Sequence, residues 1–136
     1  MSSPALALRA AIHARLVADG PLLALLGGPR VYDEPPRGAA PPYVVLAECR
    51  SADVSGDETP AEEHRVALEI WSREGGLSQA LKVSDRVARV IDGAALALDG
   101  SRLASLAWTG AEAARETDGK LRRAVVTFRA VTEPEP

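Results

Sequence analysis

The sequence is poor in the residue types on which most small catalytic, metal-binding and secreted domains depend. Its 136 residues include one cysteine, Cys49, and two histidines, His13 and His64. A lone cysteine cannot form an internal disulfide, so the chain fits a reducing compartment. A metal site needs several His, Cys or carboxylate ligands close together, and this set does not supply them. We therefore expect no metal, no cofactor and no disulfide framework.

Long apolar runs and an excess of basic charge are also lacking. No apolar stretch approaches the ~20 residues that span a bilayer. The N-terminus has no basic segment followed by an apolar one, so we expect neither a membrane contact nor a secretory signal. The net charge is −3, which is far from the strongly basic surface of a dedicated nucleic-acid-binding protein.

The composition that remains is that of one folded domain. Hydrophobic residues make up 46% of the chain and charged residues 26%, which argues against wholesale disorder. The length suits a single domain over residues 1–136. Leu, Val, Ile and Ala must build most of its core, because the chain has only five aromatic residues: Tyr32, Tyr43, Trp71, Trp108 and Phe128.

Two segments have the apolar spacing of amphipathic helices. Leu8, Ile12 and Leu16 recur every four residues and predict a helix over about 4–18. A second helix is predicted over about 78–92.

Glycine and proline mark where these helices begin and end. Asp19-Gly20-Pro21 is predicted to end the first helix, and the apolar residues 22–26 then form a short turn closed by Gly27-Gly28. Gly75-Gly76 is predicted to break a strand, and Ser78 to cap the second helix.

Alternating side chains predict the strands. Val66, Leu68 and Ile70 point to one side of an extended segment over 62–73, and Trp71 points to the other. Asp118-Gly119 is a two-residue hairpin signal. The remaining strands are predicted over 43–50, 102–108, 111–117 and 120–131.

Loops and a tail complete the prediction. Residues 33–42 form a Pro-rich loop, residues 51–61 a flexible acidic loop, and residues 133–136 a frayed tail. Hairpins between neighbouring strands imply antiparallel pairing, and helices of this kind cover one face of such a sheet. We predict an α+β fold in which two main helices pack on one face of an antiparallel sheet of four to five strands.

The sequence offers one weak pair of candidate catalytic residues. Cys49 as a nucleophile needs a histidine base, and His64 lies near the start of the next predicted strand. The alternative is a strand cysteine that acts as a small hydrophobe. Gly27-Gly28 and Gly75-Gly76 lack the Lys-Ser/Thr pair of a phosphate loop, and we interpret both as turns. We predict no catalytic residue.

Two sets of residues are candidates for contacts with other proteins. An aromatic side chain on the sheet face away from the helices needs cover from another chain or from its own. The candidates for a subunit or tube interface are Tyr43, Trp71, Trp108 and Arg129. The candidates for docking or for lining a channel are the acidic residues Asp53, Asp57, Glu58, Glu62 and Glu63.

The order of the motifs resembles a known family of assembly proteins. An N-terminal helix is followed by LLGGPRVYD at 25–33, PYVVL at 42–46, VALEIWS at 66–72 and DGKLRRAVVTFR at 118–129. This pattern, over about residues 4–132, is similar to the tail-terminator or tail-completion proteins of long-tailed phages, prophages and gene transfer agents. The family has no catalytic residues to transfer.

The resemblance implies a structural role in a virion or gene transfer agent particle assembled in the bacterial cytoplasm. It implies a homo-hexameric ring on the head-proximal end of the tail tube. Such a ring stops polymerisation of the tube protein and presents a surface to the head-completion or stopper protein. DNA passes transiently through the lumen without sequence-specific binding, and we expect that lumen to hold more Asp and Glu than Lys and Arg, because basic contacts to phosphate would retain the DNA.

Two alternatives stay open. One is the neighbouring head-closure protein of the same particle. The other is a small α+β module that binds a ligand or a peptide, or an enzyme that uses Cys49 and His64; it requires a concave pocket that holds both residues.

Overall fold

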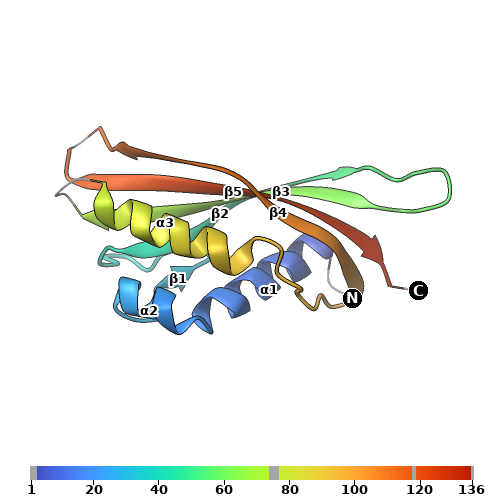
Figure 1. Cartoon of the computed structure of the whole chain (residues 1–136), viewed down its shortest axis with the longest axis horizontal. Coiled ribbons are helices and arrows are strands. Elements are labelled where there is room, and N and C mark those ends of the chain that lie inside the picture. The colour runs from blue at the N-terminus through green and yellow to red at the C-terminus, as the bar shows by residue number, and fades with distance from the viewer. Residues whose placement is uncertain (1–2, 74–76, 118, 136) are drawn as a thin grey trace.

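The computed structural model describes residues 3–73, 77–117 and 119–135, and in them three helices and five strands (Figure 1). The fold is α+β with a mostly antiparallel sheet, as predicted. Along the chain the elements are α1 (Pro4–Val17), α2 (Gly20–Leu26), β1 (Val31–Tyr32), β2 (Tyr43–Asp53), β3 (Glu62–Arg73), α3 (Ser78–Ile91), β4 (Ser101–Arg115) and β5 (Leu121–Pro134).

The sheet runs in the order β1-β2-β3-β5-β4, with long β3 and β5 at its centre. The pairs β2–β3, β3–β5 and β5–β4 are antiparallel, whereas the two residues of β1 run parallel to β2. β3 spans the residues predicted from its alternation, and its side chains are alternately buried and half-exposed. The sheet therefore has one face toward the core and one face free of helices.

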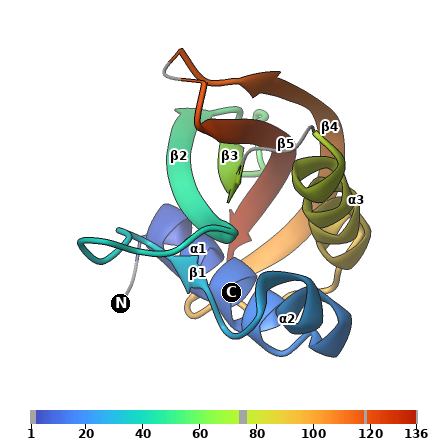
Figure 2. The ribbon, with the colours of Figure 1, turned by 90° about the vertical axis from the view of Figure 1, so that its left-hand side faces the viewer.

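The core lies between the inner face of the sheet and the helices, which pack on that one side (Figure 2). The predicted stripe of α1, Leu8, Ile12 and Leu16, is fully buried. α3 adds the buried Val83 and Val87. From the sheet the main core residues are Val44, Leu46, Val66, Leu68, Ile70, Ala124, Val126, Phe128 and Ala130.

Asp19 joins the helices to one another. Its carboxylate accepts the Leu22 backbone N–H at 2.9 Å and so caps α2. It also accepts two hydrogen bonds from the Arg86 guanidinium of α3, at 2.7 and 2.8 Å. These bonds to Arg86 hold the pKa of the Asp19 carboxyl below its usual value, and the bond to Leu22 acts in the same direction. One side chain thus fixes both the start of α2 and its position against α3.

The helical elements differ from the prediction at two points. Residues 20–26 form a helix rather than a turn, because Asp19 caps it, Pro21 suits its first turn, and Gly27 ends it with a left-handed φ of 79°. Ser78 is not the cap of α3: the N-cap is Leu77, which makes no side-chain hydrogen bond. The first difference adds a seven-residue helix, and the second moves the N-cap of α3 by one residue.

The strands differ in their extent. The predicted strands 102–108 and 111–117 are one strand, β4, with register shifts between Leu103 and Ser105 and between Trp108 and Gly110. The predicted loop 51–61 is too long, because β2 continues to Asp53 and pairs it with Glu62. The predicted frayed tail is wrong for Glu133 and Pro134, which belong to β5. Three of the predictions concern Gly75-Gly76, Asp118 and Pro136, which lie outside the described residues.

Candidate functional site

The helix-free face of the sheet carries three of the four predicted interface residues: Tyr43, Trp71 and Arg129. Tyr43, Trp71 and Arg123 are register neighbours on β2, β3 and β5. The Arg123 guanidinium carbon lies 5.8 Å from the centre of the Trp71 ring. The Trp71 indole N–H donates to Glu69 at 3.2 Å, and Arg123 pairs with the same carboxylate at 3.1 Å. Trp71 is therefore partly covered by its own chain.

Tyr43 and Arg129 are also held by neighbours on this face. The rings of Tyr43 and Tyr32 lie 5.8 Å apart, and burial raises the pKa of the Tyr43 phenol. Arg129 donates to Glu63 at 2.7 Å, and this bond is the main reason that the pKa of Glu63 is lowered. Arg65 pairs with the same carboxylate at 2.9 Å. This face therefore carries several ion pairs and is not an apolar patch.

Trp108 lies apart from the other three. It is on the edge strand β4, 47% exposed, and its register partner is the core residue Phe128. Its backbone N–H donates to the Asp92 carboxylate at the end of α3, at 2.9 Å. The four candidates therefore do not form one patch, and Trp108 is the most exposed of the three aromatic ones.

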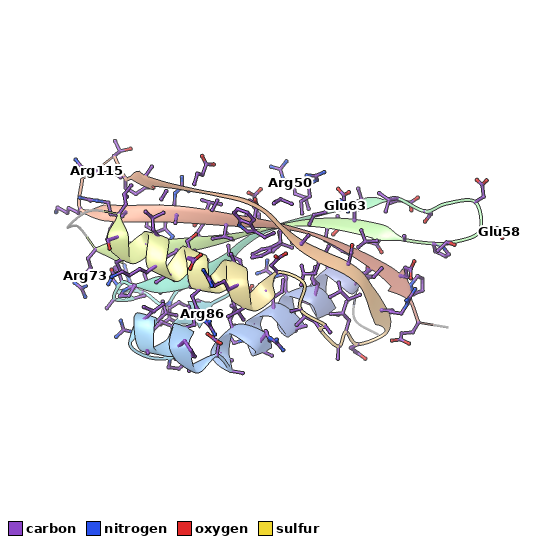
Figure 3. All side chains as sticks on the ribbon, in the orientation of Figure 1. Arg50, Glu58, Glu63, Arg73, Arg86 and Arg115 are labelled. Atoms are coloured by element: carbon purple, nitrogen blue, oxygen red, sulfur yellow. The ribbon has the colours of Figure 1, made fainter. Side chains whose placement is uncertain are left out.

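The five acidic candidates gather on a single projecting hairpin. We call residues 53–63 the acidic arm; they include the end of β2, the connecting loop and the start of β3. The arm extends beyond the helix layer, with Glu58 near its tip (Figures 1 and 3). Residues 51–60 are all exposed. Asp53 accepts hydrogen bonds from the Ser55 hydroxyl and backbone N–H, which lower the pKa of the Asp53 carboxyl.

The opposite end of the sheet is basic, which the sequence reasoning missed. Arg73 ends β3, Arg115 ends β4, and Arg122 and Arg123 follow Leu121, the first residue of β5. Arg115 is the register partner of Arg122, and Arg73 is the partner of Leu121. With Lys120 these residues form what we call the basic end, marked in Figure 3 by Arg73 and Arg115. In the sequence, the four basic residues within 115–123 are the feature that indicates this end.

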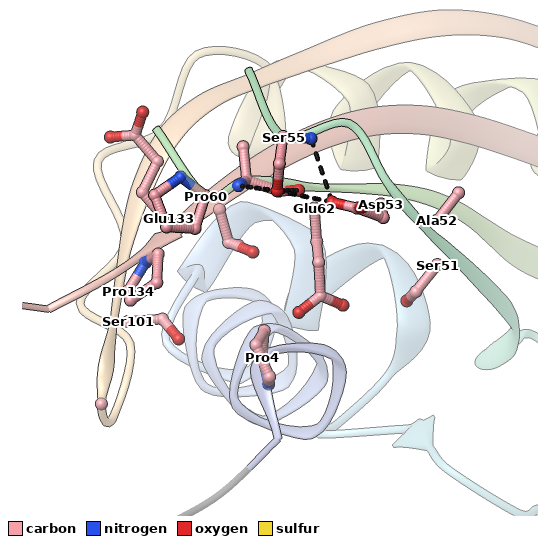
Figure 4. A pocket seen from close by; sticks show the side chains of 13 residues that line it. Pro4, Ser51, Ala52, Asp53, Ser55, Pro60, Glu62, Ser101, Glu133 and Pro134 are labelled. Carbon is pink, nitrogen blue, oxygen red and sulfur yellow. Dashed lines mark hydrogen bonds between the residues drawn. The ribbon is translucent and has the colours of Figure 1, made fainter. Parts of the chain in front are cut away.

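A pocket lies at the base of the acidic arm. Its volume is about 470 Å³, and it lies between the N-terminus of α1, the arm and the start of β4 (Figure 4). Asp53, Glu62 and Glu133 give it an acidic lining, and Arg102 pairs with Glu133. Ser51 and Thr132 add hydroxyl groups.

The pocket contains no arrangement for nucleophilic catalysis by Cys49. His64 is fully buried, with Nδ1 2.7 Å from the Ser51 hydroxyl and Nε2 2.8 Å from the Thr132 hydroxyl. Both ring nitrogens are thus bonded to hydroxyl groups. Cys49 faces Val66 in the register of β2 and β3, whereas Ser51 faces His64. The Cys49–His64 pair expected of an enzyme is therefore not formed.

The described part of the chain lacks two further features. Residues 3–73, 77–117 and 119–135 contain no group of three or more His, Cys, Asp or Glu side chains that could hold a metal ion. None of the helices in those ranges has the length and apolar character needed to cross a membrane.

Comparison with known proteins shows which family the chain belongs to. Residues 10–133 match the family described as "Tail completion protein gp17". The chain belongs to the tail completion protein gp17 family. The fold is also similar to a chain from a solved structure titled "Virion of native gene transfer agent (GTA) particle", with 33% sequence identity and a TM-score of 0.88. That match covers 97% of this chain and 99% of the other. None of the curated proteins compared matches the chain.

Membership of the tail completion family gives the chain a structural role in a phage-type tail. The match to the gene transfer agent chain runs almost end to end on both sides. The expected family is thereby confirmed.

Proposed function

We propose that this chain forms a ring of six copies on the head-proximal end of a tail tube. The ring ends polymerisation of the tube protein and presents its other side to the head-completion or stopper protein. Assembly takes place in the bacterial cytoplasm, and DNA later passes through the lumen. The chain acts through its shape and surface and catalyses no reaction.

The observation that carries this proposal is the match to the tail completion family over residues 10–133. The similarity to a chain of a gene transfer agent virion, which covers 97% of this chain and 99% of the other, also supports it. The bonding of His64 to two hydroxyl groups, and its register away from Cys49, supports a role without catalysis.

The surface of the chain suits assembly into a closed ring. A cyclic oligomer larger than a dimer joins two different patches of the same subunit, repeated around the axis. The acidic arm and the basic end are two such unlike regions, at opposite ends of one sheet. Trp108 adds an exposed aromatic side chain on a third region, which we assign to a contact with the ring neighbour or the tube.

We also propose that the lumen of the ring carries more Asp and Glu than Lys and Arg. Basic side chains that contact phosphate release counterions and hold DNA tightly, which would slow its passage. The net charge of −3 is compatible with such a surface. A channel lined by arginine in the assembled ring would contradict this part of the proposal.

Deletion of the gene tests the proposal. Particles should then fail to join heads to tails, and electron microscopy should show tubes of uncontrolled, greater length without heads. Tails of normal length on heads that lose their DNA would instead indicate head closure. Particles of normal dimensions with full DNA delivery would contradict a role in either place. The Cys49→Ala chain, supplied in trans, should restore normal particles as well as the unchanged chain does.

A further inference from the structure

The two ends of the sheet carry opposite charge. Residues 53–63 hold five acidic and no basic side chains, whereas residues 115–123 hold four basic and two acidic ones. β3 runs from Glu62 at the acidic arm to Arg73 at the basic end. A strand of this length spans roughly 40 Å, which is several Debye lengths at physiological salt. Within one copy the two ends therefore do not neutralise each other.

In the described part of the chain, some of the outermost charged side chains at the two ends of the sheet form no ion pair. Glu63 is taken by Arg65 and Arg129. Among the residues that the structure describes, Asp57 and Glu58 on the arm form no ion pair, and neither does Arg115 at the other end. These side chains are exposed. They are available to a partner at little desolvation cost.

Within the described ranges, the two outer edges of the sheet each have an unpaired segment, one beside the acidic arm and one at the basic end. On β2, the strand β1 pairs with residues 44–45, and Arg9 donates to the Leu46 carbonyl at 3.0 Å. On β4, Gly93 donates to the Leu106 carbonyl at 2.9 Å, and Asp92 accepts from Trp108. The beginning of the β2 edge and the middle of the β4 edge are thus occupied. In the described residues, no strand pairs with the outer edge of 48–53, next to the arm, or of 110–115, at the basic end.

We propose that the acidic arm of one copy docks on the basic end of the next copy of the same chain. This inference rests on the proposed ring, and it names the contact that closes it. The occupant is a second copy because each copy supplies both members of a complementary pair, in charge and in free backbone edge. The contact joins unlike patches, so each copy keeps one arm and one basic end free for its neighbours until the ring closes.

Strand direction is compatible with this contact. β2 and β4 run in opposite directions within the sheet. In a cyclic ring every copy has the same orientation relative to the axis, so β2 of one copy and β4 of the next run antiparallel. Residues 48–53 and 110–115 lie at opposite ends of the sheet, so their edges meet when the strands are inclined to the axis, as strands in a closed barrel are. Addition of a strand at a free sheet edge supplies backbone hydrogen bonds, and the charged side chains select the partner.

A charge exchange tests the contact in assembled particles. Producer cells that lack the gene are complemented with one of four chains, and particles are purified from them. The chains are the wild type, Asp57→Lys/Glu58→Lys, Arg115→Glu/Lys120→Glu, and the variant with all four substitutions. We measure tail length by electron microscopy and the amount of the chain retained per purified particle. Each double variant should retain roughly tenfold less chain, because like charges then face each other across the contact. The fourfold variant should recover to within about threefold of wild type, since its charges are complementary again.

Matched control variants change the same net charge elsewhere. Glu34→Lys/Asp85→Lys corresponds to the arm variant, and Lys82→Glu/Arg89→Glu corresponds to the variant of the basic end. All four control positions are exposed and lie outside the two proposed contact regions. Both controls should retain the chain at the wild-type level. Circular dichroism of each purified variant checks that it is folded.

The outcomes separate this contact from the proposed function. If the wild-type chain fails to restore tail length, the proposed function fails and the contact with it. If the wild-type chain restores tail length and the arm variant is retained as well as its control, the contact is wrong and the ring stands. Normal retention of the arm variant with impaired DNA delivery places the arm in the lumen and also overturns the contact. Failure of the fourfold variant to recover overturns the pairing of these two ends.

Discussion

His64 makes the stability of the fold depend on pH in a range where few other groups titrate. Its side chain is fully buried and bonded to the hydroxyls of Ser51 and Thr132. Burial disfavours the charged imidazolium and so lowers the pKa of His64 from its usual value near 6.5, although the Glu62 carboxylate acts in the opposite direction. We expect the free energy of unfolding to decrease as the pH falls below that value.

The sign and the size of this effect follow from proton uptake. Above about pH 6.5 the imidazole is neutral in the folded and the unfolded chain, so stability does not depend on it. Below that pH the unfolded chain binds a proton that the folded chain does not, and stability is lost until the folded pKa is reached. The loss is at most about 1.4 kcal/mol per pH unit, so a shift from about pH 7.5 to 5.5 costs up to about 1.4 kcal/mol.

Urea unfolding at a series of pH values, followed by tryptophan fluorescence, measures the effect. His64→Gln keeps a donor and an acceptor at the site but cannot titrate, so its stability should be nearly constant over this range. His13 is the other histidine, and its Nε2 lies 3.0 Å from the Val31 carbonyl. His13→Gln should keep the wild-type pH dependence. A wild-type stability that is flat from pH 7.5 to 5.5, or an equal slope in His64→Gln, would refute the reasoning.

Four further predictions concern stability, chemistry and assembly. Asp19→Ser keeps the cap of α2 and loses the pair with Arg86, whereas Asp19→Ala loses both, so urea unfolding should show the alanine variant less stable by about 1 kcal/mol. Phe128 is 1% exposed, and Phe128→Ala should cost about 3–5 kcal/mol in the same assay. Cys49→Ala should leave tail length unchanged in complemented particles; a loss of DNA delivery would contradict a role without catalysis. Trp108 fluorescence, recorded in a Trp71→Phe background, should shift to the blue on assembly, and an unchanged spectrum would remove it from the interface.

Local periodicity accounts for the elements that the sequence predicted well. The four-residue spacing of Leu8, Ile12 and Leu16 places one stripe on α1, and all three side chains are fully buried. The alternation of Val66, Leu68 and Ile70 sets the extent of β3 and its two faces. Both patterns are complete within a dozen residues, so no knowledge of distant segments is needed to interpret them.

The errors arise where distant segments decide the structure. Residues 22–26 are predicted as a turn, but Asp19 caps a second helix there and is itself held by Arg86, 67 residues away. β4 continues through two register shifts because β5 pairs along its whole length. The parallel pairing of β1 with β2 depends on how α1 and α2 place the chain, which no local pattern records.

The candidate site was predictable only in part. The five acidic residues are close in sequence and form the arm as a continuous segment. The basic end joins Arg73 to residues 115–123, and only the register of β3 with β5 brings them together. The cover of Trp71 by Arg123 likewise crosses two strands that are 52 residues apart in sequence. Sequence reasoning left intrachain cover and an interface as equal alternatives for that side chain.

Growth of tail tubes from purified tube protein tests the central claim most directly. Addition of this chain in amounts of about one ring per tube end should stop elongation and leave tubes whose length no longer increases with time. The chain should be found at one end of each tube, and the Asp57→Lys/Glu58→Lys variant should require a much higher concentration for the same effect. Tubes that elongate at the same rate with and without the chain would contradict the claim that it caps them.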